Sequence, residues 1–144
     1  MHIQTASERF DIINRLKRAN ECSLVVMVFI DGKNGPFTGK IVTWNEKRFD
    51  FSIKMEDGEQ RDFRVPTVMA MKVIADELYG LFGTVQNIRY IEADGESDSA
   101  CGTVIQVEDG KVAVNTFPGV EMIQLSDIWE IDSPEEEDCV PWEP

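Results

Sequence analysis

The chain has 144 residues, of which 42% are hydrophobic and 9% aromatic, enough for a packed core, and this argues against a largely disordered protein. That length accommodates one ordinary domain or two very small ones. The formal net charge of −13 is unevenly spread, since residues 1–74 carry +2 and residues 75–144 carry −15. A surface as acidic as that of the second half repels nucleic acid and attracts basic partners.

The sequence carries no signal for export or for a membrane. The longest apolar run, Leu24–Ile30, is far shorter than the roughly 20 residues of a membrane helix. The first residues lack the basic and apolar regions of a signal peptide. Because Cys22, Cys101 and Cys139 have no paired spacing, we expect structural or incidental thiols in a reduced, cytoplasmic setting.

The first expected element is an amphipathic helix from about Ala6 to Asn20. Thr5 and Glu8 have the spacing of a capping box, in which each side chain satisfies a free backbone N–H group. Three residues at helical spacing are expected to form its apolar face: Phe10, Ile13 and Leu16.

Strands are expected to fill most of the chain after Ser23, because β-branched and aromatic residues alternate with polar ones there. Asp-Gly pairs punctuate this region, and such a pair between alternating runs is a strong hairpin signal. The pattern therefore favours an antiparallel meander. The pairs are Asp31-Gly32, Asp57-Gly58, Asp94-Gly95 and Asp109-Gly110.

The Asp-Gly pairs also indicate an internal repeat. Six residues separate Asp31-Gly32 from Gly39, and six separate Asp94-Gly95 from Gly102. With these glycines superposed, apolar residues match apolar residues: Ile41 with Val104, Val42 with Ile105, Trp44 with Val107, Phe49 with Val112 and Phe51 with Val114. After a three-residue gap, Phe63, Val65, Val68 and Met71 match Ile123, Leu125, Ile128 and Ile131. The alternative is one longer meander that uses Asp-Gly turns throughout.

The repeat predicts a mainly β protein, in which an N-terminal α-helix is followed by two tandem small antiparallel barrels of about five strands each. The first barrel and its helix comprise residues 1–74, the second, acidic barrel residues 75–132, and an acidic, Pro-containing tail residues 133–144. Ala75–Gly80 is expected to form a helical turn before a strand that begins at Leu81. Because such small units bury little surface alone, the two barrels should pack on each other or on other subunits, and a homo-oligomer is possible.

Residues 6–74 resemble the Sm-like proteins, within the broader class of SH3-like small barrels. The resemblance rests on the leading helix, then Val26-x-Val28-x-Ile30-Asp31-Gly32, then Gly39-Lys40-Ile41, and a closing Phe63-x-Val65-x-x-Val68. It implies a small, strongly bent barrel that assembles into rings and binds RNA. The Tyr-Lys-His run and the Arg-Gly pair that contact RNA in that family are not matched, because Phe63-Arg64-Val65 stands there.

Signatures of catalysis and of metal binding are missing from the sequence. His2 is the only histidine, and it lies near one end of the chain, so no nucleophile and base pair is apparent. The run Asp94-Gly95-Glu96-Ser97-Asp98 lacks the sixth-position glycine and the distal glutamate of an EF-hand, and we interpret it as a solvated hairpin loop. We expect no enzyme activity, no metal and no cofactor.

Several aromatic residues have two interpretations. Trp44, Phe49, Phe51 and Phe63 could form an aromatic cage or a stacking platform, but their alternation with polar residues favours core positions. Trp129 alternates away from the neighbouring apolar pair, so we expect it to be exposed and suited to an interface.

These observations predict a non-catalytic binding or inhibitory protein whose acidic half engages a basic protein surface, for example the nucleic-acid groove of an enzyme. The tail is either part of that interface or a solvating end. The predicted partner-binding residues are Glu92, Asp94, Glu96, Asp98, Glu108, Asp109, Trp129, Glu130, Glu135, Glu136, Glu137, Asp138 and Trp142. The alternative is an Sm-like RNA-binding oligomer that uses Arg15, Arg18, Lys40, Lys47, Arg48 and Arg64.

Overall fold

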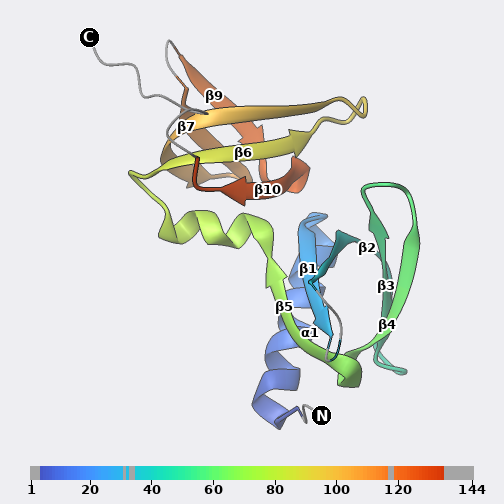
Figure 1. Cartoon of the computed structure of the whole chain (residues 1–144). Coiled ribbons are helices and arrows are strands. Elements are labelled where there is room, and N and C mark those ends of the chain that lie inside the picture. Colours follow the sequence, from blue (N-terminus) through green and yellow to red (C-terminus); the bar gives the residue numbers. More distant parts are fainter. Residues whose placement is uncertain (1–3, 31, 33–34, 117–118, 135–144) are drawn as a thin grey trace. The chain divides into compact units, whose positions relative to one another are not determined.

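The computed structural model confirms a mainly β protein with a leading helix (Figure 1). It describes residues 4–30, 32, 35–116 and 119–134. The elements are α1 (Ala6–Cys22), β1 (Val25–Ile30), β2 (Phe37–Asn45), β3 (Asp50–Met55), β4 (Gln60–Arg64), the 3₁₀ helix η1 (Val65–Thr67), β5 (Val68–Val73), the 3₁₀ helix η2 (Ile74–Gly80), β6 (Val85–Ile91), β7 (Ser97–Glu108), β8 (Lys111–Asn115), β9 (Val120–Gln124), the 3₁₀ helix η3 (Leu125–Asp127) and β10 (Ile128–Asp132).

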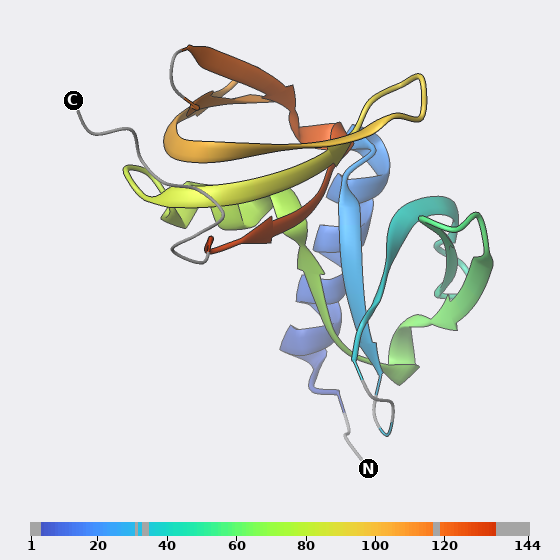
Figure 2. The same ribbon diagram turned by 45° about the horizontal axis from the view of Figure 1, so that its top comes forward.

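The chain divides into two compact units between Val73 and Ile74, which we call unit 1 and unit 2. Each contains one five-stranded antiparallel sheet. The order is β4-β3-β2-β1-β5 in unit 1 and β9-β8-β7-β6-β10 in unit 2. The two sheets therefore have the same topology, with β1 to β5 equivalent to β6 to β10. The β6–β7 hairpin projects from the sheet of unit 2 in both views (Figures 1 and 2).

The two sheets share irregularities as well as strand order. Where β2 pairs with β3, Val42 is the extra residue of a bulge, and Ile105 is the extra residue where β7 pairs with β8. A second bulge leaves Met69 of β5 and Trp129 of β10 without a cross-strand partner. Bulges re-aim strands at fixed positions, so the internal repeat extends to the detailed register of the backbone.

Gly39 and Gly102 explain why the repeat retains a glycine in its second strand. A Cβ atom on Gly39 would lie 2.5 Å from the carbonyl oxygen of Lys54 in β3, and one on Gly102 would lie 2.1 Å from the carbonyl oxygen of Asn115 in β8. Both distances are far below van der Waals contact. The third strand therefore crosses the second so closely that only glycine fits there.

The sequence alignment of the repeat is wrong by two residues in the third strand. The turn before that strand comprises residues 46–49 in unit 1 and residues 109–110 in unit 2. Phe51 therefore corresponds to Val112, and Phe49 is a turn residue with a φ of 54°. Both predicted matches, Phe49 with Val112 and Phe51 with Val114, are overturned, because turns of different length connect equivalent strands.

Helix α1 begins as predicted and ends two residues later than expected. The N–H of Glu8 donates to Thr5 Oγ1 at 3.1 Å, and the N–H of Thr5 donates to Glu8 Oε1 at 3.3 Å, which confirms the capping box. Ser23 adopts a φ of 57°, and Leu24 N–H closes the end on the carbonyl of Ala19 at 2.9 Å. The left-handed residue stops the helix at this point.

The buried face of α1 differs from the predicted one. Ile12, Leu16 and Ala19 are at most 4% exposed, whereas Phe10 is 65% exposed and Ile13 is only half-buried. Two stripes of the helix are apolar, the predicted one with Phe10 and Ile13 and the observed one with Ile12 and Ala19. The observed stripe is buried because it packs against β2, β5 and η1. Leu16 is the residue that the two stripes share.

Unit 2 has a short helix at the place where unit 1 has α1. The 3₁₀ helix η2 corresponds to the predicted turn, and its Leu78 is fully buried. Strand β6 begins at Val85 and not at Leu81, because Leu81 accepts the hydrogen bond of a tight turn from the N–H of Thr84 at 3.1 Å. No helix in the described part of the chain is long and apolar enough to cross a membrane.

Candidate interaction surface

The β6–β7 hairpin presents three carboxylates at its tip. Two backbone hydrogen bonds close the turn, from Glu92 N–H to the Glu96 carbonyl and from Gly95 N–H to the Glu92 carbonyl, both 2.9 Å long. Asp94 Oδ1 accepts a third from Glu96 N–H at 3.0 Å. As a result, carboxylate oxygens of Glu92, Asp94 and Glu96 lie within 4.8 Å of one another, with all three residues exposed.

This hairpin tip is the place in the described part of the chain where His, Cys, Asp or Glu ligand atoms converge. The convergent residues differ from the run considered in the sequence, because Glu92 takes part and Asp98 does not. Three exposed carboxylates can attract a cation, and they can equally attract Lys or Arg side chains of a partner.

Charges from the hairpin and from strand β9 act together on Tyr90. It is buried in β6 and pairs across the strands with Asp98. Burial, followed by the charges of Asp98, Glu121 and Glu92 and a hydrogen bond with Asp98, raises the pKa of Tyr90 above its ordinary value of 10.0. Glu121 of β9 therefore contributes to the negative field of the hairpin. We call Glu92, Asp94, Glu96, Asp98 and Glu121 the acidic face.

We expect Asp98→Asn to lower the pKa of Tyr90 towards its ordinary value of 10.0, because the substitution removes the strongest of the nearby charges. In the wild type, the stability that the neutral phenol provides is complete below the unfolded pKa and is lost as the pH rises through the higher folded pKa. Alkaline titration of phenolate absorbance measures the shift, in a Tyr79→Phe background that leaves Tyr90 as the single tyrosine.

Glu108→Gln is the control for this titration, since Glu108 is not among the charges that act on Tyr90. It should leave the phenolate titration unchanged. An Asp98→Asn protein whose Tyr90 titrates like that of the wild type would contradict the placement of Tyr90 next to the acidic face.

Two of the predicted partner-binding residues lie at the other end of β7. Glu108 is the last residue of this 12-residue strand, and Asp109 follows in the turn with a φ of 54°. Glu108 pairs across the strands with Lys111 and accepts a hydrogen bond from Gln106. These two carboxylates therefore form a group separate from the acidic face.

Strand β10 carries two carboxyl groups that share a hydrogen bond, Glu130 and Asp132. Arg89 Nε lies 3.2 Å from Glu130 Oε2. Hydrogen bonds with Asp132 and then with Arg89 lower the pKa of Glu130, while the bond with Glu130 and burial raise the pKa of Asp132. Asp132 is therefore the carboxyl group of the two that keeps its proton to a higher pH. Trp129, expected to be exposed, is half-buried at its bulge.

The cysteines differ in their surroundings. Cys22 is an exposed free thiol at the end of α1. Cys101 is half-buried in β7 and is not a free thiol, so the expectation of a structural or incidental thiol is wrong for it. Cys139 lies beyond the described ranges, and so do other residues considered in the sequence: His2, Glu135, Glu136, Glu137, Asp138 and Trp142.

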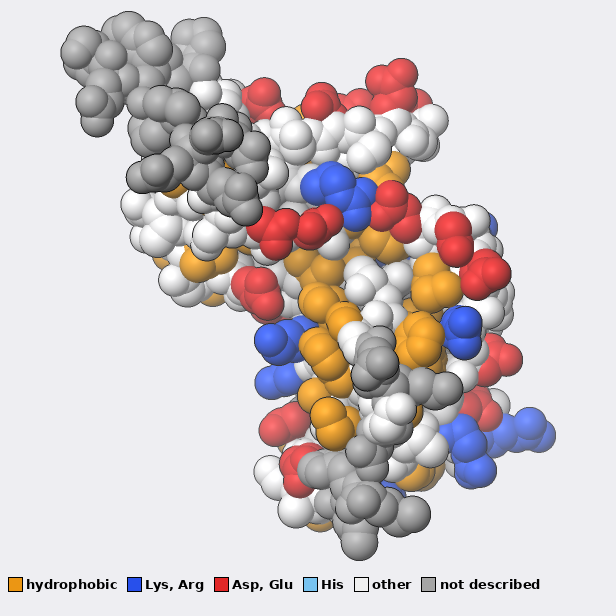
Figure 3. Space-filling view, in the orientation of Figure 1, with side chains coloured by type: hydrophobic (Ala, Val, Ile, Leu, Met, Phe, Trp, Pro, Cys, Tyr) orange, Lys and Arg blue, Asp and Glu red, His pale blue; other side chains and the backbone are white. Residues whose placement is uncertain are grey.

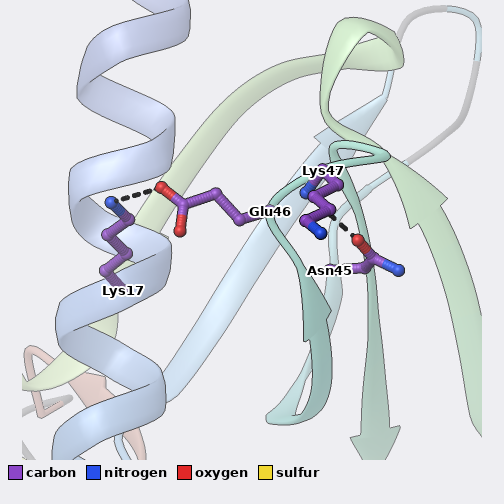
Figure 4. Close-up of polar contacts among 4 residues, drawn as sticks. All are labelled: Lys17, Asn45, Glu46 and Lys47. Atoms are coloured by element: carbon purple, nitrogen blue, oxygen red, sulfur yellow. Dashed lines mark hydrogen bonds and ion pairs between the residues drawn. The ribbon is translucent and has the colours of Figure 1, made fainter.

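The structure brings together three of the six cations predicted to bind nucleic acid. Lys47 and Arg48 occupy the β2–β3 turn, where Asn45 Oδ1 accepts a hydrogen bond from each N–H at 3.1 Å. Figure 4 shows the bond of Lys47. Arg64 is close to this turn because it pairs with Asp50, the first residue of β3. We call Lys47, Arg48 and Arg64 the basic corner.

The other three predicted cations are placed elsewhere. Lys40 lies in the first half of β2, opposite Lys54. Arg15 donates to the carbonyl of Met71 at 2.6 Å, and Arg18 is exposed on α1. The structure therefore does not gather the six residues into one basic surface.

Further cations of unit 1 have partners within the unit. Lys17 Nζ lies 2.9 Å from Glu46 Oε1 (Figure 4), and the Arg61 guanidinium lies 4.9 Å from the ring centroid of Phe37. Lys and Arg mix with Asp and Glu over unit 1 in Figure 3, whereas Asp and Glu predominate over unit 2. Unit 1 consequently has a mixed surface.

Two of the aromatic residues considered for a cage belong to the core. The rings of Phe51 and Phe63 stack with centroids 5.4 Å apart, and both are at most 6% exposed. Trp44 is half-buried, and Phe49 is 40% exposed in its turn. The expectation of core positions thus holds for Phe51 and Phe63 and is wrong for Phe49.

An open pocket of about 340 Å³ lies beside the basic corner in unit 1. The carboxylates of Asp50 and Asp62 and the guanidinium group of Arg64 all line this pocket. Such a mixture of charges favours neither an anion nor a cation strongly. The lining residues are Thr43, Asp50, Phe51, Asp62, Phe63 and Arg64.

The sequence patterns did not reveal three exposed apolar residues in the strands of unit 2. Ile105, Val120 and Met122 are 48%, 57% and 58% exposed. The signal that could have identified Val120 and Met122 is the repeat itself, because the polar residues Gln60 and Asp62 occupy the equivalent positions of β4.

No protein-family model matches the sequence, and no curated protein matches it either. The fold, the charges and the surfaces described above are therefore the basis for a functional proposal.

Proposed function

We propose that this protein is a non-catalytic binding or inhibitory protein whose unit 2 engages a basic surface of a partner protein. The observation that carries the proposal is the acidic face, where carboxylates from the hairpin and from β9 gather around Tyr90. Residues 75–132 contain 12 Asp and Glu against only two cations, Arg89 and Lys111. Since Arg89 pairs with Glu130, little positive charge is available to neutralise the acidic face.

A negative surface of this kind steers a basic partner into encounter, and opposite charges fix the register of the complex. The nucleic-acid groove of an enzyme is one such basic surface, and a protein that covers it would act as an inhibitor. The scaffold in this proposal is a pair of small barrels of the Sm-like and SH3-like type, supported by the five-stranded sheets and the leading helix.

An affinity pull-down from the native host tests the proposal, with both bound proteins and bound RNA identified. The test variant neutralises the acidic face by Glu92→Gln, Asp94→Asn, Glu96→Gln and Glu121→Gln. The control neutralises four exposed carboxylates of unit 1 by Asp11→Asn, Glu21→Gln, Glu59→Gln and Asp62→Asn. Both variants change the net charge by the same amount.

We expect a basic protein to be captured by the wild type and by the control, and to bind the acidic-face variant about tenfold or more weakly, with a strong dependence on salt. A chain lacking residues 133–144 measures the contribution of the tail. Recovery of specific RNA without a basic protein would contradict the proposal, as would equal losses in both charge variants.

The second candidate is RNA binding by unit 1, and the basic corner favours it. Neutralising Lys47, Arg48 and Arg64 by alanine substitution would then weaken RNA binding at all sequences, because cations that contact phosphate contribute mainly sequence-independent affinity. Salt-dependent binding of single-stranded RNA that the triple variant abolishes would favour this candidate over the first.

A further inference from the structure

Strand β9 exposes two large apolar side chains on its outer face. Val120 and Met122 are 57% and 58% exposed, and Met122 lies opposite the half-buried Ala113 of β8. Ile123, between Met122 and Gln124, points to the core and is 3% exposed. The outer face of the strand therefore carries two exposed apolar side chains, although only the opposite face contributes to the core.

The internal repeat shows that the fold does not need apolar residues on this outer face. The equivalent strand β4 pairs with β3 as β9 pairs with β8, and it carries Gln60 and Asp62 where β9 carries Val120 and Met122. Unit 1 thus shows that the same strand can be polar on its outer face. Exposed apolar side chains that folding does not require are a mark of an interaction site.

Strand β9 also has an open edge. It is the last strand of its sheet, and within the described residues no strand pairs with its other side. The N–H and C=O groups along such an edge can hydrogen-bond an extended segment of another protein. An added strand would lie beside Val120 and Met122 on one face and beside Glu121 on the other.

The charges next to β9 specify what such a segment must carry. Glu121 is exposed and, as the strand neighbour of Met122, lies on the opposite face of the sheet. With Glu92 and Asp98 it acts on Tyr90, so the surroundings of Glu121 are negatively charged. Side chains of a strand alternate between its two faces. A segment that suits both faces therefore alternates apolar residues with Lys or Arg.

We propose that the edge of β9 accepts an extended segment of the partner in which basic and apolar residues alternate, bound as a sixth strand of unit 2. The inference rests on the proposed function and deepens it, because it assigns the site and the local sequence pattern of the basic partner. The acidic face provides attraction at long range, and β9 provides the hydrogen bonds and the apolar contacts that select an alternating sequence.

The test uses the full chain and a short synthetic peptide in which Lys and Val alternate. A block peptide of the same composition, with all Lys before all Val, is the reference probe. Val120→Gln with Met122→Asp introduces the residues that unit 1 carries at these positions, so folding should be preserved, and circular dichroism checks this. Met69→Asp, at an exposed methionine on edge strand β5 of unit 1, is the control.

We expect the alternating peptide to bind the wild type and the Met69→Asp control alike, and to bind the Val120→Gln, Met122→Asp protein about tenfold or more weakly. Glu121→Gln should weaken binding several-fold, whereas Glu59→Gln, an equal change of charge in unit 1, should not. Amide hydrogen exchange followed by NMR should slow in β9 when the peptide is bound.

The outcomes separate this inference from the proposed function. If both peptides bind equally well, in a salt-dependent manner that the β9 substitutions leave unchanged, the edge-strand site is wrong and the acidic binding surface stands. If neither peptide binds, the edge-strand inference and the proposed function both fail. Self-association of the wild type that the β9 substitutions abolish would assign the edge to a second copy of this chain and overturn the inference.

Discussion

Gly102→Ala is expected to destabilise the protein by about 1–3 kcal/mol or more, the typical cost of inserting a carbon into a closely packed site. The added Cβ would lie 2.1 Å from the carbonyl oxygen of Asn115 and 2.7 Å from its carbonyl carbon. Both are backbone atoms, so no side chain can rotate to relieve the contact. Strands β7 and β8 would have to separate where they cross most closely. Urea unfolding followed by circular dichroism measures the loss.

The repeat provides a second test of the same contact. Gly39→Ala should also destabilise the protein, because a Cβ there would lie 2.5 Å from the carbonyl oxygen of Lys54. Gly80→Ala is the control, since a Cβ added at Gly80 would meet no atom within 4 Å and the φ of this residue lies outside the left-handed region. A Gly102→Ala protein as stable as the Gly80→Ala protein would contradict the close crossing of the two strands.

Leu16→Ala is expected to cost about 2–5 kcal/mol, the range for truncating a buried leucine. Leu16 is fully buried on the face of α1 that packs against β2, β5 and η1. The substitution leaves a cavity between the helix and the sheet, which neither element can fill without leaving its hydrogen-bonded register. Thermal or urea unfolding of the full chain measures the change.

Phe10→Ala is the matched control on the same helix. Phe10 is 65% exposed, so its truncation should change the free energy of unfolding by no more than about 0.5 kcal/mol, as for most surface positions. The comparison also tests the corrected face of the helix, because the spacing of apolar residues alone places Phe10 with Leu16. Equal losses for the two substitutions would restore the face predicted from the sequence.

Local patterns in the sequence predicted most of the fold. The capping box at Thr5 and Glu8, the described Asp-Gly turns and the shared spacing to Gly39 and Gly102 each depend on neighbouring residues. The described turns are Asp57-Gly58, Asp94-Gly95 and Asp109-Gly110, and Asp31 of the fourth pair lies outside the described residues. Such features act through short-range sterics and hydrogen bonds, so they are visible without a structure. The alignment failed only beyond the β2–β3 turn, because the length of a turn does not change which strands pair across it.

The candidate site was predicted less completely. The negative charge of residues 75–144 was evident from composition, and the structure joins Glu92, Asp98 and Glu121 around Tyr90. Glu121 is far from the hairpin in sequence, and only the folding of the sheet brings it near. The exposure of Val120 and Met122 was missed, because an apolar residue in a strand is taken for core until the position of the strand in the sheet is known.

The sequence by itself determined the leading helix, the repeated strands, the turns and the sign of the charge on each half, since these follow from local sterics, side-chain periodicity and composition. Only the tertiary structure decided which stripe of α1 is buried, which carboxylates act together and which strand is left with an open edge. Those three properties depend on contacts between residues distant in the chain, and strand order sets them. Strand order places both β9 and β4 at an open edge. The residues at equivalent register, Val120 and Met122 in β9 and Gln60 and Asp62 in β4, then distinguish the proposed interaction site from a solvated edge.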